Sequence, residues 1–236
     1  MDIVKKIIVY GDSILKGVQI NKENKRYFVD NNIDTDAIGE KFDLNIENLS
    51  KFGCTLPKGS KLIEKALENG LNCDALIMDF GGNDCDFNWK EVSDNPDKDH
   101  QPHTPLDIFI KTYKDIIAKL KDAGILPILT NLPPIEPHKY FNWFTSNGLN
   151  KENIMKWLGN VSTIYRYQEN YSRSVEKIAV ETDCPLVDLR GAFLKHRRID
   201  DYLCEDGIHP NTAGQKLIED AFSAFAKNRL QPITAK

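Results

Sequence analysis

The sequence predicts an α/β fold built on a mainly parallel sheet. Two observations favour this class: short apolar runs of strand length recur along the chain, and segments with helical spacing separate most of them. The chain has 236 residues, of which 41% are hydrophobic and 28% are charged, so it is long enough to bury one sizeable core. We therefore expect a single domain over residues 1–236.

Five apolar runs are expected to form the strands of the sheet. They are Val4 to Tyr10, Asn45 to Leu49, Ala75 to Phe80, Ile125 to Leu129 and Leu186 to Leu189. Four other stretches place apolar residues three and four positions apart, which is typical of amphipathic helices. They are Ser60 to Glu68, Leu106 to Lys121, Ser162 to Glu181 and Thr212 to Arg229. Gly124 and Asn211 stand where a helix stop signal and a helix start signal belong.

Two stretches interrupt this alternation and are expected to be inserted loops, at about 86–104 and 133–157. The first is polar and charged, and the second combines prolines with aromatic residues. Long irregular stretches in a compact domain are commonly functional, and at the carboxyl ends of strands such loops surround the ligand crevice. Tyr140, Phe141, Trp143 and Phe144 therefore have two open interpretations: a lid or platform for substrate, or packing beneath a long loop.

The charge balance indicates which partners to expect. A net charge of -4 gives no long-range attraction to nucleic acid or to an anionic membrane surface, so no nucleic-acid partner is expected. No segment approaches the roughly 20 apolar residues of a membrane span. The chain also enters its first expected strand with no signal stretch before it, which predicts a cytoplasmic protein.

Five cysteines form an odd set without C-x-x-C spacing, which argues against a disulfide framework and against a structural zinc site. We expect free thiols in a reducing compartment, and neither a metal nor a cofactor. Cys54, Cys85 and Cys204 lie within two residues of candidate site residues. Oxidation there could inhibit the protein, although filling small apolar gaps is the commoner role of such cysteines.

The tripeptide Gly11-Asp12-Ser13 follows the first expected strand directly. We expect a strand-to-helix turn here, with Ile14 to Gly17 beginning the helix and the Ser13 hydroxyl presented at the sheet edge. A serine hydroxyl becomes a useful nucleophile when an imidazole takes its proton and a carboxylate orients that imidazole. Alone, the tripeptide is more typical of a turn in which serine caps a helix.

A second motif, Asp206-Gly-Ile-His209, lies on a loop just ahead of the last expected helix. A carboxylate three residues before a histidine can reach Nδ1 while Nε2 faces outward. The other four histidines lie in polar surroundings, so His209 is the candidate base and Asp206 its orienting partner. Asp12 is interpreted as structural, accepting backbone donors of the turn around Ser13.

Two further positions could hold the oxyanion that forms when serine attacks an acyl group. Gly53 follows the second expected strand and offers an unobstructed backbone N–H, and Asn83 follows the third and offers a side-chain amide. Each alone is explained equally well as a turn residue. Their occurrence at successive strand ends, together with Ser13 and His209, favours one assembled site.

The order Gly-Asp-Ser, glycine, Gly-x-Asn-Asp and Asp-x-x-His-Pro, from Gly11 to Pro210, resembles the SGNH (GDSL-type) hydrolase family. The resemblance implies a flavodoxin-like, three-layer α/β/α sandwich with a five-stranded sheet. It also implies a Ser13, His209 and Asp206 triad, in which Ser13 N–H, Gly53 N–H and Asn83 form the oxyanion hole.

Competing motifs are weaker. Ser13 and Lys16 fit S-x-x-K and Ser93-Asp94-Asn95 spells S-D-N, two signatures of serine β-lactamases, but the third, K-T-G, is missing. The chain has no G-x-S-x-G elbow, and its glycines fit neither common nucleotide-binding pattern.

We therefore expect a serine ester hydrolase that needs no cofactor and acts on a small-molecule acyl ester through an acyl-enzyme. The acyl group is expected to be small, with acetyl favoured, on a polar or sugar-like alcohol, and Tyr140, Phe141 and Trp143 are candidate substrate-binding residues. An acyl-thioesterase, an acyltransferase and a non-catalytic binding module remain open alternatives. The sequence carries no signal for oligomeric state.

Overall fold

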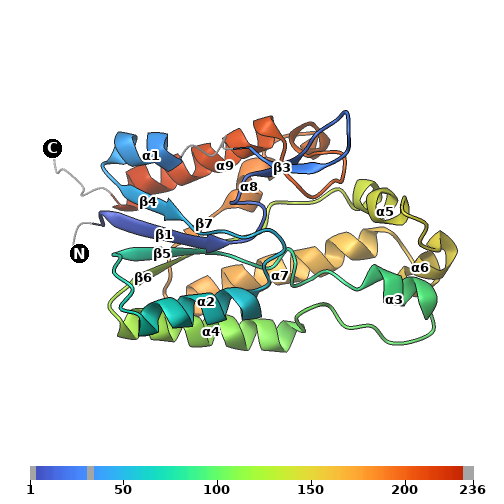
Figure 1. Cartoon of the computed structure of the whole chain (residues 1–236), viewed down its shortest axis with the longest axis horizontal. Coiled ribbons are helices and arrows are strands. Elements are labelled where there is room, and N and C mark those ends of the chain that lie inside the picture. Colours follow the sequence, from blue (N-terminus) through green and yellow to red (C-terminus); the bar gives the residue numbers. More distant parts are fainter. Residues whose placement is uncertain (1–3, 31–34, 231–236) are drawn as a thin grey trace.

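The computed structural model describes residues 4–30 and 35–230 and shows a five-stranded parallel sheet between two layers of helices (Figure 1). The strand order is β4-β1-β5-β6-β7, which is the doubly wound order of flavodoxin-like folds. The chain reverses its direction of winding between β1 and β5. In open α/β sheets, ligands bind at this switch point, beyond the carboxyl ends of the strands. The expected fold class is confirmed.

The strands coincide with the expected apolar runs to within a few residues. Their bounds are β1 Lys6–Gly11, β4 Asn45–Asn48, β5 Ala75–Asp79, β6 Leu126–Thr130 and β7 Leu186–Val187. Because successive side chains of a strand point to opposite faces, β1 supplies both cores. Ile8 and Tyr10 pack in one hydrophobic cluster, while Ile7 and Val9 pack in the other.

Helices cover both faces of the sheet (Figure 1). One layer holds α2 Leu56–Glu68, α4 Leu106–Asp122 and α7 Ser162–Glu181. The other holds α1 Thr35–Phe42, α8 Leu189–Leu194 and α9 Thr212–Phe225, after which a π-helical turn covers Ala226–Leu230. The two helix signals lie where expected: Asn211 accepts hydrogen bonds from Ala213 N and Gly214 N, and Gly124 ends α4 with φ 74°.

The expectation of a helix directly after Ser13 is wrong. Lys16 N donates to Asp12 O at 3.1 Å, but this single turn stops at Gly17, whose φ of 75° redirects the backbone. The chain then forms an antiparallel hairpin of two short strands, β2 Val18–Ile20 and β3 Tyr27–Val29. This hairpin places Tyr27 beside the candidate site.

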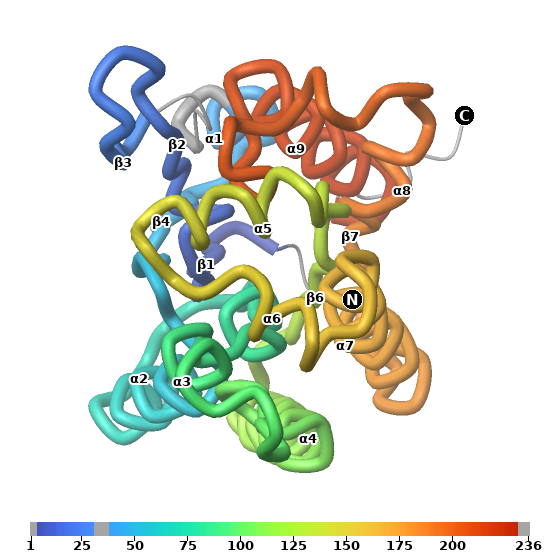
Figure 2. The backbone as a smooth tube through the Cα atoms, turned by 90° about the vertical axis from the view of Figure 1, so that its right-hand side faces the viewer, coloured from blue at the N-terminus to red at the C-terminus, as the bar shows by residue number. Residues whose placement is uncertain are grey.

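The two interrupting stretches are partly helical rather than irregular. Residues 86–104 contain α3 Trp89–Asp94, and residues 133–157 contain α5 Pro137–Thr145 and most of α6 Lys151–Leu158. Asn88 and Asn150 cap α3 and α6 through their side chains. Figure 2 looks onto the end of the molecule where α3, α5 and α6 lie in front of the sheet. A short 3-10 helix, Ile199–Tyr202, precedes the Asp206 loop.

Candidate active site

Ser13 lies immediately beyond β1, on the turn that leads into the hairpin. Asp12 fixes this turn, because its Oδ1 accepts the backbone N–H of Ile14 at 2.8 Å. Gly11 is needed just before it, since a Cβ there would come within 2.9 Å of Asp79 Cβ on the paired strand β5. Ser13 is only 6% exposed, yet it lines a cavity of the described chain.

The loop that carries Asp206 and His209 folds back on itself, with Cys204 N donating to His209 O at 2.7 Å. Asp206 is fully buried, and its Oδ1 accepts the backbone N–H groups of Ile208 and His209, each at 3.1 Å. Its Oδ2 lies 2.5 Å from His209 Nδ1. Three hydrogen bonds therefore hold the carboxylate.

The structure brings Ser13, His209 and Asp206 into one hydrogen-bonded row. His209 Nε2 lies 2.9 Å from Ser13 Oγ, although 196 residues separate them in sequence. The tautomer that satisfies both contacts has Nδ1–H donating to Asp206 and Nε2 accepting the Ser13 hydroxyl proton. A serine hydroxyl held in this way can lose its proton to the imidazole as it attacks an electrophile.

The three sequence-predicted oxyanion donors lie on different turns: Ser13 after β1, Gly53 after β4 and Asn83 after β5. Ser13 and Asn83 line the cavity, and Gly53 is not among its lining residues. Asn83 Nδ2 donates to Asp12 Oδ2 at 2.9 Å and, more weakly, to Cys54 O at 3.4 Å. Gly53 lies beside this contact with a φ of 66°, between Cys54 and the cavity-lining Phe52. Within the part of the chain that the structure describes, the N–H groups of Ser13 and Gly53 donate to no acceptor.

Two further carboxylates are buried behind this row at the end of β5. Asp84 accepts Leu56 N at 2.9 Å and Thr104 Oγ1 at 2.6 Å, so it ties two loops together. Asp79 Oδ1 accepts Thr130 Oγ1 at 2.6 Å, but its Oδ2 has no hydrogen-bond partner. Burial raises the pKa of each carboxyl to about 6, and burial beside Asp79 raises the pKa of Asp12 well above its usual range.

A cavity of about 370 Å³ opens over Ser13 and has two sides. On the catalytic side are Ser13, Asn83, His209 and the aromatic rings around the imidazole. On the helical side are cavity-lining residues of the loop after β5 and of α3, α5 and α7: Asp86, Phe87, Trp89, Tyr140, Phe144, Ile164, Tyr167 and Gln168.

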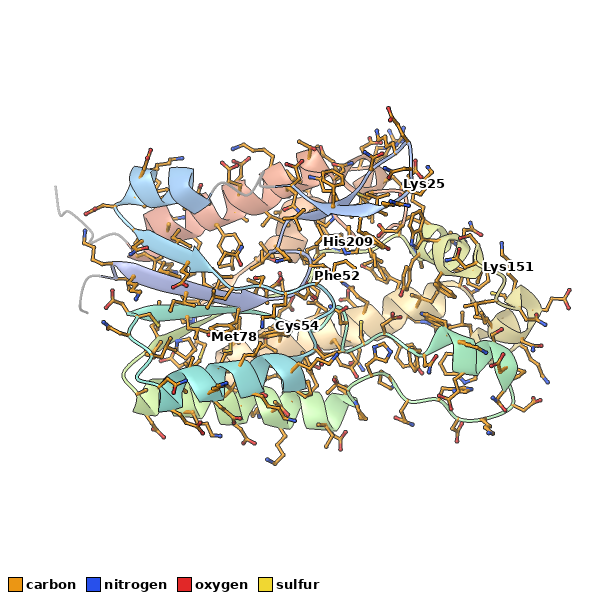
Figure 3. All side chains as sticks on the ribbon, viewed as in Figure 1. Lys25, Phe52, Cys54, Met78, Lys151 and His209 are labelled. Atoms are coloured by element: carbon orange, nitrogen blue, oxygen red, sulfur yellow. The ribbon has the colours of Figure 1, made fainter. Side chains whose placement is uncertain are left out.

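Aromatic rings surround the outer face of His209. Phe52 stacks on the imidazole at 6.1 Å between ring centroids, and Figure 3 shows the two side by side beyond the strand ends. Tyr27 meets the imidazole edge-on at 5.2 Å, and Trp143 Nε1 donates to the Tyr27 hydroxyl at 3.0 Å. Burial, and then the charge of Asp206, raise the pKa of Tyr27 to about 12, so this phenol remains protonated at neutral pH.

The structure divides the three candidate substrate-binding residues. Tyr140 and Trp143 line the cavity, whereas Phe141 does not and is buried with Ile154 and Leu158 in the hydrophobic cluster behind the cavity wall. Helical geometry explains the division, because positions 140, 143 and 144 share one face of α5 and position 141 does not. Of the three candidates, Phe141 is therefore not among the residues that line the cavity.

Sequence reasoning missed Tyr27, Phe52 and Asp86, all of which line the cavity. Phe52 directly precedes Gly53, and Asp86 follows Asn83 by three residues. Their proximity in sequence to the predicted site residues could have indicated both. Tyr27 had none, because it reaches the site only through the unexpected hairpin.

The cysteines near the site are buried and unpaired. Burial raises the pKa of Cys54, Cys85 and Cys204, and nearby carboxylates raise it further, so these thiols resist becoming reactive thiolates. Their environment supports the packing interpretation. In the described residues, no three His, Cys, Asp or Glu side chains are grouped so as to hold a metal ion, and none of the helices is long and apolar enough to cross a membrane.

Comparisons with known proteins identify the family and agree with the fold. The model of the GDSL-like lipase/acylhydrolase family matches residues 9–217. A lipase/acylhydrolase from Enterococcus faecalis is 18% identical, with a TM-score of 0.63 over 98% of this chain and 100% of that chain. An acetylxylan esterase from Geobacillus stearothermophilus is 19% identical, with a TM-score of 0.65 over 99% and 100%. No curated protein matches the chain by sequence.

Proposed function

The chain belongs to the GDSL-like lipase/acylhydrolase family and is a carboxylic ester hydrolase, and from this premise we propose that it works through an acyl-enzyme on Ser13. The observation that carries the proposal is the row of contacts from Ser13 Oγ to His209 Nε2 and from His209 Nδ1 to Asp206. This is the arrangement that a serine nucleophile requires.

In the first half of the reaction, Ser13 Oγ attacks the ester carbonyl while His209 Nε2 takes its proton. Asp206 keeps the imidazole in the required tautomer and stabilises the imidazolium that forms. The tetrahedral oxyanion accepts hydrogen bonds from Ser13 N–H, Gly53 N–H and Asn83 Nδ2. The two backbone donors are uncommitted, and Asn83 exchanges its weak contact with Cys54 O for the oxyanion.

The intermediate then collapses. The carbon–oxygen bond to the alcohol breaks, His209 returns its proton to the leaving oxygen, and the acyl group remains on Ser13. A water molecule next gives a proton to His209 as it attacks the acyl carbon, and Ser13 leaves with that proton to restore the free enzyme. Every proton in this cycle is transferred through Nε2, so the proposal requires no metal or cofactor.

The proposed substrate is an uncharged small-molecule ester with a small acyl group, acetyl foremost, on a polar or sugar-like alcohol. The cavity lining supports this, because its described residues include three aspartates and neither lysine nor arginine. The acetylxylan esterase named above provides a precedent for such a substrate on a similar fold. The five buried, unpaired cysteines support a reducing, cytoplasmic setting.

The test compares kcat/KM for p-nitrophenyl acetate, a monoacetylated sugar and an acyl thioester, in the wild type and in Ser13→Ala. We expect the oxygen esters to be cleaved faster than the thioester, and Ser13→Ala to lose at least about 1000-fold with each. A dominant rate with the thioester would indicate a thioesterase, and acyl transfer to an added alcohol a transferase. No turnover of any acyl compound would indicate a binding module and contradict the proposal.

A further inference from the structure

We infer that Asp86 is the acceptor of a subsite that binds vicinal hydroxyls on the alcohol part of the ester, as found in polyols and sugars. The inference rests on the proposed hydrolysis at Ser13 and names the substrate class that this site serves. Asp86 lies in the loop after β5, three residues beyond Asn83, and lines the same cavity as Ser13 and His209.

Two neutral donors hold the Asp86 carboxylate in place. Trp89 Nε1 donates to Oδ1 at 2.8 Å, and the Tyr140 hydroxyl donates to Oδ2 at 2.6 Å. The backbone N–H of Phe87 also interacts with this carboxylate. An ionised carboxylate accepts about four hydrogen bonds in all, so acceptor capacity remains. Asp86 is also partly exposed, and it lines the cavity. Hydroxyl donors of a ligand match this remaining capacity.

The charge around Asp86 favours an uncharged donor over an anion. No lysine or arginine among the described residues forms an ion pair with Asp86, and its cavity also contains Asp12 and Asp79. A phosphate or carboxylate entering this cavity would meet the negative charge of Asp86 at short range. Hydroxyl groups avoid that repulsion and form charge-assisted hydrogen bonds with the carboxylate.

The walls beside Asp86 suit the carbon face of a polyol. Trp89 and Phe144 stack on each other with ring centroids 4.4 Å apart, and Tyr140 meets Phe144 edge-on at 5.0 Å. All three rings line the cavity, and the polar groups of Trp89 and Tyr140 are directed to Asp86. A few placed polar groups within an apolar wall are what fixes the orientation of a small ligand.

The experiment measures kcat/KM for a monoacetylated methyl pyranoside with a free vicinal diol, and for the dideoxy analogue that lacks both hydroxyls. We expect the wild type to prefer the diol by about 10-fold or more, as hydrogen bonds to a charged acceptor predict. In Asp86→Asn this ratio falls to about two-fold or less, whether the individual kcat/KM values rise or fall. Asp94→Asn, on the exposed side of nearby α3, is the matched control and keeps the wild-type ratio.

A second arm needs only the wild type. The free methyl pyranoside and its dideoxy analogue are tested as competitive inhibitors of p-nitrophenyl acetate hydrolysis, and the diol is expected to inhibit at least about five-fold more strongly. Equal inhibition, or a diol preference that survives Asp86→Asn, overturns the subsite. A third outcome also overturns the subsite: a choline ester is preferred over its uncharged 3,3-dimethylbutyl analogue, and the diol is not preferred over the dideoxy compound. A quaternary ammonium has no hydrogen to donate, so this result would indicate a cation site.

The two levels of proposal fail in different ways. If p-nitrophenyl acetate is cleaved and Ser13→Ala abolishes the activity, the acyl-enzyme proposal is supported. The diol preference in kcat/KM then tests the Asp86 subsite separately. If Ser13→Ala retains activity on every ester, the proposed function fails, and the subsite fails with it.

Discussion

Asp206 and Asp86 serve the two sides of one cavity, and the protein uses their oxygens differently. Asp206 is fully buried behind His209. Three of its hydrogen bonds are made within its own loop, and its carboxylate also interacts with the Tyr27 hydroxyl of the hairpin. Asp86 accepts from two side chains and keeps part of its surface in the cavity. The catalytic side is thus assembled without substrate, whereas the helical side leaves an acceptor free for one.

The largest effect is expected from disturbing the catalytic side at Asp206. In Asp206→Asn, an amide N–H facing Nδ1 would move the imidazole proton to Nε2, which could then no longer accept from Ser13. We expect kcat to fall about 1000- to 10,000-fold. Steady-state kinetics with p-nitrophenyl acetate measure this, and Asp201→Asn, an exposed residue of the preceding 3-10 helix, is the control. A loss below about ten-fold would separate Asp206 from catalysis.

A smaller loss of kcat is expected when Asn83 is removed, or when the Asp12 carboxylate that accepts its hydrogen bond is changed. Asn83→Ala deletes a proposed oxyanion donor, so kcat should fall about 100- to 1000-fold. In the wild type, Asp12 Oδ2 accepts a hydrogen bond from the Asn83 amide. Asp12→Asn replaces this acceptor with an NH2 group, so we expect kcat to fall about ten-fold or more with little change in KM.

The double variant decides whether Asp12 acts through Asn83. If it does, adding Asp12→Asn to Asn83→Ala costs little further activity, because no amide is left to orient. Two losses that multiply would show that Asp12 affects the reaction by another route.

The unpartnered oxygen of Asp79 predicts an effect on stability rather than on rate. Burial raises the pKa of Asp79 to about 6, so the native state binds a proton more tightly than the unfolded chain. This contribution favours folding below the unfolded pKa of about 3.9 and is lost as pH rises through about 6. Asp79→Asn should therefore raise the free energy of unfolding at pH 7 by about 2 kcal/mol relative to its effect at pH 4.

Urea unfolding at the two pH values measures this difference. Asp84→Asn is the informative contrast, because Asp84 has a similarly raised pKa but its carboxylate accepts hydrogen bonds from Leu56 and Thr104. An asparagine keeps a neutral Oδ1 for these donors but places an NH2 where Oδ2 accepts Leu56 N at 3.0 Å, so Asp84→Asn should destabilise the protein at both pH values. A stabilised Asp84→Asn at pH 7 would show that burial alone decides the outcome.

The smallest effect is expected at the cysteines beside the catalytic side. Because burial raises the pKa of Cys54, Cys85 and Cys204, mild peroxide should leave them as thiols and leave activity within about two-fold. Mass-spectrometric mapping of the treated protein measures the modification at each thiol. Inactivation that follows oxidation of one of these cysteines would revive a regulatory role.

The sequence predicted the catalytic side better than the helical side for a physical reason. Ser13, Asn83 and His209 follow strands or precede a helix within short motifs, so parallel pairing alone brings them to one edge of the sheet. Strands β1, β5 and β6 were equally predictable, because their apolar runs match burial in the two cores, whereas β4 is mostly exposed. The placement of Tyr27 depends on a hairpin of two three-residue strands, too short to show alternation.

The helical side of the cavity was harder to predict. Its residue types could be read from the sequence, but their arrangement in space could not. When residues 133–157 are taken as a loop, Phe141, Tyr140 and Trp143 are equally good candidates for binding substrate. A helix over Pro137–Thr145 separates them, since it turns Phe141 to the core and the other two to the cavity. Asp86 gains its significance only from Trp89 and Tyr140, and the latter lies 54 residues away in sequence.

The most direct test of the central claim is covalent labelling of the folded protein with a fluorophosphonate, followed by intact mass and peptide mapping. The account predicts one adduct per chain, located on Ser13, with no adduct in Ser13→Ala and much slower labelling in His209→Ala. Absence of an adduct on the folded wild type, or an adduct on another residue while Ser13→Ala still cleaves esters, would contradict it.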